Sequence, residues 1–172
     1  LNAFFDDPIV KEMISCSDKQ VMITAEWHDP RTGIVVPVKG LIDLVPNVRH
    51  PEFGQFLGDM KTAADASPDM WGRQIYKFKY HVQGGLYLDI YETATEKNRT
   101  EVGHVITESK EPYETGRRIM SSEFIEMGRI TYQNALESYC QCLKTDVWPR
   151  YDDVTDRRVN GFTITEPEAW MI

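Results

Sequence analysis

The spacing of apolar positions predicts strands in the first third of the chain. Residues 21–27 and 34–45 are rich in β-branched side chains, and the stretch between them carries the turn-forming residues Pro30 and Gly33. This pattern favours a β-hairpin. A further apolar run at 54–61 predicts a third strand after the hairpin.

Helical patterns precede and follow these strands. A first helix is predicted near 6–14, with Asp6 or Asp7 as its N-cap and Pro8 in its first turn. The other helical stretches cover 68–91 and 121–144, and two short runs at 100–108 and 115–120 predict edge strands. The predicted order is α-β-β-β-α-β-β-α, which corresponds to an α/β fold with a mixed central sheet flanked by helices.

Length and composition are those of one ordinary globular domain. The 172 residues are 41% hydrophobic and 27% charged, which suits a single domain over residues 1–172 with a sizeable core. No apolar run approaches the roughly 20 residues that a membrane span needs. The sequence also does not open with the charged segment and apolar stretch of a signal peptide. We expect a cytoplasmic protein with no membrane partner.

Two carboxylates and one ammonium group are the first candidate chemistry. Asp43 lies near the end of the second predicted strand, and Asp59 and Lys61 lie two residues apart on the third, so they project from the same face. If the two strands are neighbours, Asp43 and Asp59 converge. Taken alone, an Asp-x-Lys pair is more often a surface ion pair, and an Asp at a strand end is more often a turn residue. The order of all three favours a functional site.

A hard divalent cation, Mg²⁺ or Mn²⁺, fits this set. A protein typically supplies two carboxylates and one backbone carbonyl as ligands to such an ion. Here the Met60 carbonyl is the natural third ligand. Such a metal ion activates water and neutralises charge on a phosphodiester. Lys61 is placed to hold the nucleophilic water or to stabilise the developing oxyanion. The spacing therefore predicts phosphodiester hydrolysis.

A stripe of hydrogen-bonding side chains follows in the second helical stretch. Tyr76, Tyr80, Gln83 and Tyr87 are separated by four, three and four residues, which predicts one helical face. The alternative is a half-buried amphipathic face whose tyrosines extend their hydroxyls to water. Gly84-Gly85 within this stretch predicts either close packing on the sheet or a helix break.

Basic and aromatic residues alternate at the start of the same stretch. The net charge of −8 opposes nucleic-acid binding overall. The residues that are candidates for binding DNA are nevertheless clustered in this part of the sequence. They are Arg73, Tyr76, Lys77, Lys79 and Tyr80. A solvated helix face is the alternative interpretation.

The cysteines and histidines do not form a metal-ligand motif. Cys16, Cys140 and Cys142 lack zinc spacing, and three thiols cannot supply four ligands to an iron–sulfur cluster, so none is expected. The four histidines show no ligand spacing either, and we expect His81 at the surface.

Together these motifs resemble the PD-(D/E)XK nuclease superfamily, in its RecE-type branch of exodeoxyribonuclease eight and related phage exonucleases. The similarity runs from about Glu26 to Tyr91. Within it, GLIDLVPN resembles the strand with the first metal-binding Asp, FLGDMKTAAD the strand with the Asp-x-Lys pair, and WGRQIYKFKYHVQGGLYLDIYE the helix with Gln and Tyr four apart.

The resemblance implies a restriction-endonuclease-like core and a role for each matched residue. Asp43 and Asp59 would be metal ligands, Lys61 the catalytic lysine, and Gln83 with Tyr87 the supporting pair. The implied activity is metal-dependent exonuclease digestion of duplex DNA ends, 5′ to 3′, in phage or prophage recombination in a bacterial or phage-infected host cell.

The resemblance also implies partners: a ring-shaped homo-oligomer and a single-strand annealing recombinase. Two other interpretations stay open. One is a catalytically incomplete nucleic-acid-binding or assembly module, and the other is an endonuclease on the same core.

One departure concerns the N-terminus. RecE-type nucleases have an upstream helix that contributes a histidine ligand, and no histidine precedes the first predicted strand here. Either the sequence is a fragment lacking that helix, or another group binds the metal, with Glu12 and Glu26 as candidates.

Overall fold

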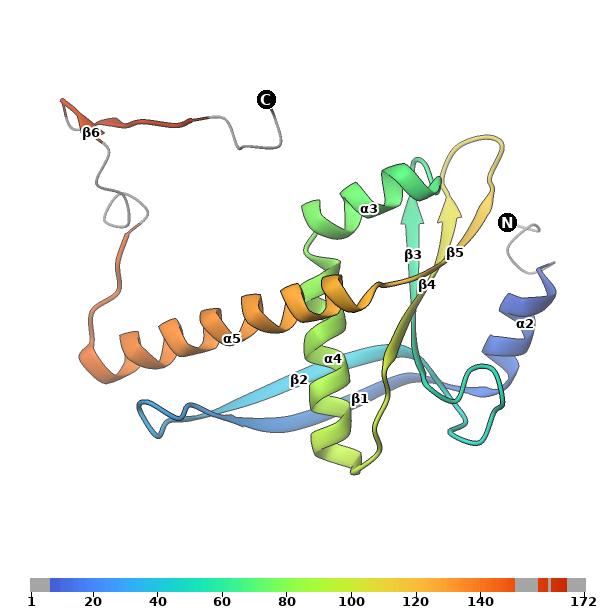
Figure 1. The fold of residues 1–172 in the computed structure, drawn as a ribbon, viewed down its shortest axis with the longest axis horizontal. Coiled ribbons are helices and arrows are strands. Elements are labelled where there is room, and N and C mark those ends of the chain that lie inside the picture. The colour runs from blue at the N-terminus through green and yellow to red at the C-terminus, as the bar shows by residue number, and fades with distance from the viewer. Residues whose placement is uncertain (1–6, 151–157, 161, 167–172) are drawn as a thin grey trace.

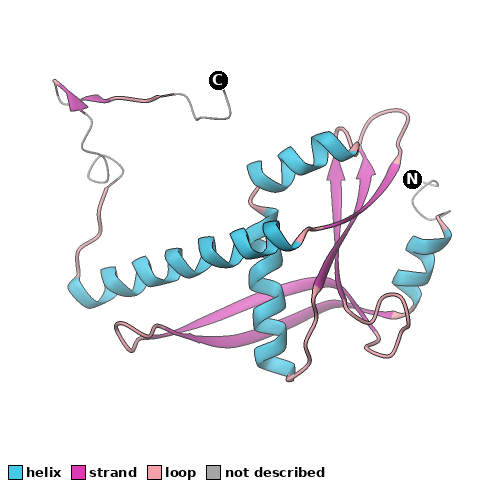
Figure 2. Ribbon diagram, in the orientation of Figure 1, coloured by secondary structure: helices cyan, strands magenta, loops and turns pink. Residues whose placement is uncertain are grey.

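The protein folds around a single five-stranded sheet (Figures 1 and 2). The structure, a computed structural model, describes residues 7–150, 158–160 and 162–166. Its elements in chain order are α2 (Pro8–Ser15), β1 (Ser17–His28), β2 (Val35–Pro46), β3 (Phe56–Ala63), α3 (Pro68–Lys77), α4 (Tyr80–Thr95), β4 (Glu101–Glu108), β5 (Thr115–Ile119), α5 (Ser122–Thr145), β6 (Arg158–Val159) and β7 (Phe162–Thr163).

The sheet is mixed, as the sequence predicts. Its strand order is β1-β2-β3-β4-β5, and β3 pairs with β4 in parallel while the other neighbours are antiparallel. A parallel pair needs a long crossover connection, and here α3 and α4 supply it. The β1–β2 hairpin extends away from β3, β4 and β5 and passes beneath α4 (Figure 1).

The main core lies between the sheet and the layer of α3, α4 and α5. Trp71 of α3, Leu88 of α4 and Ile106 of β4 are among its most deeply buried side chains. Helix α5 crosses α4 at glycines on both helices: a Cβ on Gly85 would lie 2.9 Å from the backbone N of Arg129, and one on Gly128 would overlap the carbonyl of His81. This contact sets how closely the two helices pack.

Helix α2 covers the opposite side of the sheet. Asp7 is its N-cap and accepts hydrogen bonds from the backbone N–H groups of Ile9 and Val10, as expected, while Asp6 lies outside the described residues. Met13 packs into space left by Gly58 of β3, where a Cβ would lie 2.6 Å from the Met13 Cε. The glycine before Asp59 therefore has a packing role.

The predicted helix over 68–91 is wrong in one respect, because it is two helices. Lys79 has a left-handed backbone, φ 60°, between the end of α3 and the start of α4. Tyr76 therefore does not share a helical face with Tyr80, Gln83 and Tyr87. Gly84 and Gly85 are not the break; they lie inside α4 at close contacts with β4, Met120 and α5.

None of the helices in the described part of the chain is both long and apolar enough to cross a membrane.

Candidate active site

The site lies where β2 and β3 separate. The two strands share one bridging pair, Leu44 with Gly58. The part of β2 that precedes Leu44 diverges from β3 and passes under α4, and the point of separation is called the fork (Figure 1). Asp43 stands at this fork. Its Oδ2 accepts a hydrogen bond of 2.9 Å from the Met60 backbone N–H, which has no strand partner on that side. The predicted proximity of Asp43 to the third strand is therefore present.

Asp59 and Lys61 lie on the helical side of β3 and form an ion pair. Their side chains are largely buried, with 8% and 16% of their surfaces exposed. Burial raises the pKa of Asp59; the Lys61 ammonium opposes this rise, and the negative charge of Asp43 adds to it. The Asp-x-Lys pair is thus not a surface ion pair.

Gln83 connects this pair to α4. Its Nε2 donates to Asp59 Oδ1 at 3.1 Å, and its Oε1 accepts from Lys61 Nζ at 3.1 Å. One amide therefore fixes the orientation of both charged groups.

His104, which no motif in the sequence indicates, lies directly beside Asp59. It is the register partner of Asp59 in the parallel strand β4, is 2% exposed, and places Nε2 4.0 Å from Asp59 Oδ2. The Trp71 indole donates to its Nδ1 at 3.4 Å, so the ring proton faces Asp59. Burial, with a contribution from Lys61, lowers the pKa of His104 to about 4, and the ring is neutral at neutral pH.

The two remaining candidates on α4, Tyr80 and Tyr87, flank the charged groups. Tyr80 stacks on Trp71, and Lys61 Nζ lies 4.7 Å from the centroid of its ring. Tyr80 therefore belongs to the wall of the site. Tyr87 packs over Gly40 of β2, where a Cβ would lie 2.6 Å from its Cε1. Its hydroxyl makes no hydrogen bond to any described residue.

The basic candidates lie along the second half of α3 and its junction with α4, the α3–α4 corner. Arg73, Tyr76, Lys77 and Lys79 are exposed, and Lys79 Nζ lies 4.6 Å from the centroid of the Tyr76 ring. The expectation that His81 is at the surface is wrong: it is 1% exposed, with Nδ1 3.1 Å from the Ile75 carbonyl oxygen.

A family model matches residues 1–156 of the chain, and its description is "PDDEXK-like domain of unknown function (DUF3799)". The chain belongs to this family. Membership confirms the resemblance to the PD-(D/E)XK superfamily and supports a nuclease function in general terms. The RecE-type branch stays a prediction.

A solved structure supports the fold. A proposed exonuclease from Eubacterium rectale superimposes with a TM-score of 0.61 at 15% identity, over 98% of this chain and 60% of its own. A second structure, SSO0001, gives a TM-score of 0.44 at 14% identity over 86% of this chain and 66% of its own, which is too low for inference. No curated protein matches. The PDDEXK-like chain has the predicted α/β, restriction-endonuclease-like fold and spans about 60% of the E. rectale protein.

PDDEXK nucleases generally use divalent metal ions, and the residues at the fork fit one. Asp59 Oδ2 is buried and contacted by the Lys61 ammonium, but it has no hydrogen-bond partner among the described residues. Because the N–H and C=O of a strand residue point to the same edge, the Met60 carbonyl faces the side on which Asp43 lies. Two carboxylates and one carbonyl are thus available, and water would complete the coordination of a hard cation.

No third acidic, histidine or cysteine ligand joins them to form a metal-binding cluster among the residues described. The two glutamates considered as substitutes have other partners. Glu12 of α2 pairs with His50 at 3.4 Å, and Glu26 is exposed on β1 beside His28 at 3.8 Å. The structure does not bring either into contact with the Asp43–Asp59 pair.

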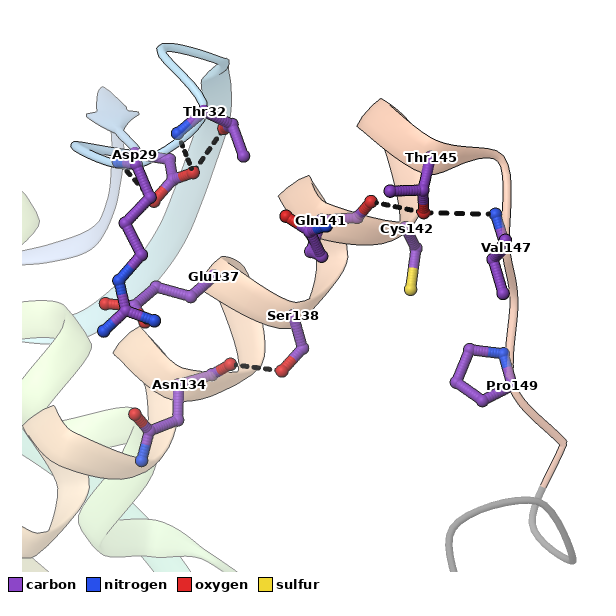
Figure 3. A pocket seen from close by; sticks show the side chains of 11 residues that line it. Asp29, Thr32, Asn134, Glu137, Ser138, Gln141, Cys142, Thr145, Val147 and Pro149 are labelled. Atoms are coloured by element: carbon purple, nitrogen blue, oxygen red, sulfur yellow. Dashed lines mark hydrogen bonds and ion pairs between the residues drawn. The ribbon is translucent and has the colours of Figure 1, made fainter.

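A separate cavity of about 650 Å³ lies between the β1–β2 loop and the C-terminal half of α5 (Figure 3). Two interactions lie at its wall: Asp29 accepts a hydrogen bond from the Thr32 backbone N–H, and Arg31 is paired to Glu137 at 3.0 Å. None of the predicted site residues lines it. The candidate chemistry therefore lies at the fork, outside this cavity.

Proposed function

We propose that this PDDEXK-like chain is a Mg²⁺- or Mn²⁺-dependent exonuclease that hydrolyses phosphodiester bonds at duplex DNA ends. The observation that carries the proposal is the convergence of Asp43, Asp59, Lys61 and Gln83 at the separation of β2 from β3. These residue types in this order match what the superfamily resemblance implies.

Each residue of the site would have its own role in the reaction. Asp43, Asp59 and the Met60 carbonyl would hold the metal ion, which supplies Lewis acidity towards water and phosphate. Lys61, held by Asp59 and Gln83, presents an ammonium group that positions water or stabilises negative charge on the phosphate oxygens. Gln83 keeps the two groups oriented, and the buried His104 excludes water behind Asp59.

The DNA would approach over the corner between α3 and α4. Arg73, Lys77 and Lys79 are exposed there and can contact backbone phosphates, while Tyr76 offers a ring for stacking. Cleavage from 5′ to 3′, a role in phage or prophage recombination in the cytoplasm, a ring-shaped homo-oligomer and an annealing recombinase as partner extend the proposal from the RecE-type resemblance.

The test is digestion of an end-labelled linear duplex beside a covalently closed circle, with Mg²⁺, Mn²⁺ or EDTA. We expect loss of the linear DNA alone, abolished by EDTA and by Asp59→Ala or Lys61→Ala. Lys97→Met, which removes an exposed ammonium after α4, serves as the matched control and should cut normally. Cutting of the closed circle would instead indicate an endonuclease.

A binding or assembly module without cleavage is the second candidate. The observation that favours it is the pair of carboxylates without a third side-chain ligand among the described residues. DNA binding without cutting under either metal, together with weak Mn²⁺ binding, would select this alternative.

A further inference from the structure

Gln20 has an unusual backbone for its position. It lies within β1 but has φ 53°, in the left-handed region that side chains other than glycine rarely adopt. The other non-glycine residues with positive φ in the described chain lie at helix ends or in turns. No turn or cap accounts for the strain at Gln20.

The strained residue faces Asp43. Lys19 pairs with Leu44 and Val21 with Ile42, so Gln20 stands opposite Asp43 at an interruption of the β1–β2 ladder. Its Nε2 donates to Asp43 Oδ1 at 2.7 Å. This is the shorter of the two hydrogen bonds that Asp43 accepts, the other being 2.9 Å from the Met60 N–H to Oδ2.

Each oxygen of Asp43 therefore has one donor, and the two donors come from different strands. A carboxylate held at both oxygens cannot rotate freely, yet each oxygen keeps a second lone pair for another partner. Hydrogen bonds of this kind to metal-binding side chains commonly set ligand orientation and affinity. An exposed amide that served stability alone would not need an unfavourable backbone.

We propose that Gln20 is a positioning residue that orients Asp43 for divalent metal binding, at the expense of backbone strain. The inference rests on the proposed metal-dependent function, because it assigns Asp43 as a ligand. It adds a residue of β1 to a site otherwise built from β2, β3, β4 and the crossover helices.

The test measures Mn²⁺ binding and thermal unfolding of the full chain, without DNA. Gln20→Gly removes the amide and accepts positive φ without strain, so we expect about tenfold weaker Mn²⁺ binding with a Tm raised by roughly 2–4 °C. Gln20→Met keeps the length and the backbone strain but removes the donor. It should weaken binding similarly with little change in Tm.

Glu96→Gly is the matched control. Glu96 is exposed at the end of α4 with φ 57°, so the change relieves similar strain away from the site. We expect a raised Tm and unchanged Mn²⁺ binding. Wild-type affinity in both Gln20 variants would overturn the inference alone, whereas absence of Mn²⁺ binding by the unaltered chain would overturn the proposed metal dependence and the inference with it.

Discussion

Gln83 is the residue through which α4 controls the charged groups of β3. Its amide donates to Asp59 and accepts from Lys61, so removing it frees two side chains at once. We expect Gln83→Ala to lower the cleavage rate by about 10–100-fold, the range typical of residues that orient metal-site ligands. The measurement is the initial rate on linear duplex at saturating metal.

Gln141→Ala gives the comparison for this prediction. Gln141 is an exposed residue of α5 at the separate cavity, so the same change should leave the rate unaltered. If Gln83→Ala cuts at the wild-type rate while folded, the amide bridge does not contribute to cleavage.

The residues of the site were predictable to different degrees. Asp43, Asp59 and Lys61 could be proposed because strand periodicity and order along the chain are local properties. His104 and Gln20 could not. His104 reaches Asp59 through a parallel strand pairing, and Gln20 reaches Asp43 through an interrupted ladder, and neither contact leaves a spacing in the sequence.

At the level of elements, the crossing of α4 and α5 depends on having no side chain at Gly128. A Cβ there would overlap the His81 carbonyl, so Gly128→Ala has to push the helices apart. We expect a loss of about 2–3 kcal/mol in the free energy of unfolding, as for overpacked cores. Denaturant unfolding followed by circular dichroism measures this change.

Gly72→Ala should have the opposite sign. Gly72 lies inside α3, and a methyl group on its Cα would have no neighbouring atom within 4 Å. Only helix propensity changes, so stability should rise by up to about 1 kcal/mol. A gain for both variants would show that the helix crossing tolerates a methyl group.

The elements themselves were largely predictable, and the main error has a physical cause. The strands of the sheet lie within a few residues of their expected bounds, because their apolar patterns are strong. The edge position expected for 100–108 is wrong, because β4 pairs with β3 on one side and β5 on the other. The break at Lys79 was missed, since a lysine gives no local signal for a left-handed backbone. On either side of the break, Trp71 packs against His104 of the sheet and His81 is buried beside Phe124 of α5, so tertiary packing accompanies the break.

For the whole molecule, the distribution of charge matters more than its sum. The net charge is −8, yet exposed cations gather at the α3–α4 corner, and Lys79 there directly precedes Tyr80, whose ring contacts Lys61 of the site. We expect the triple variant Arg73→Ala, Lys77→Ala, Lys79→Ala to bind duplex DNA more weakly. The slope of log affinity against log salt should fall by up to about 0.9 for each phosphate that the variant no longer neutralises.

Binding is to be measured in EDTA, which prevents cleavage, at several salt concentrations. A variant lacking three exposed lysines elsewhere, Lys97, Lys110 and Lys144, controls for the change in net charge. Equal salt slopes in the two triple variants would mean that the corner is not the DNA-binding surface.

The parallel pairing of β3 with β4 has a consequence for the order of folding. The β1–β2 hairpin closes between neighbouring segments, whereas Asp59 meets His104 only after the intervening α3 and α4 have folded back. Closing such a long loop costs entropy before its contacts form, which slows the step. The hairpin is therefore expected to form early in refolding, and a ribosome-bound chain that ends before β4 would carry Asp43, Asp59 and Lys61 without the strand that completes their setting.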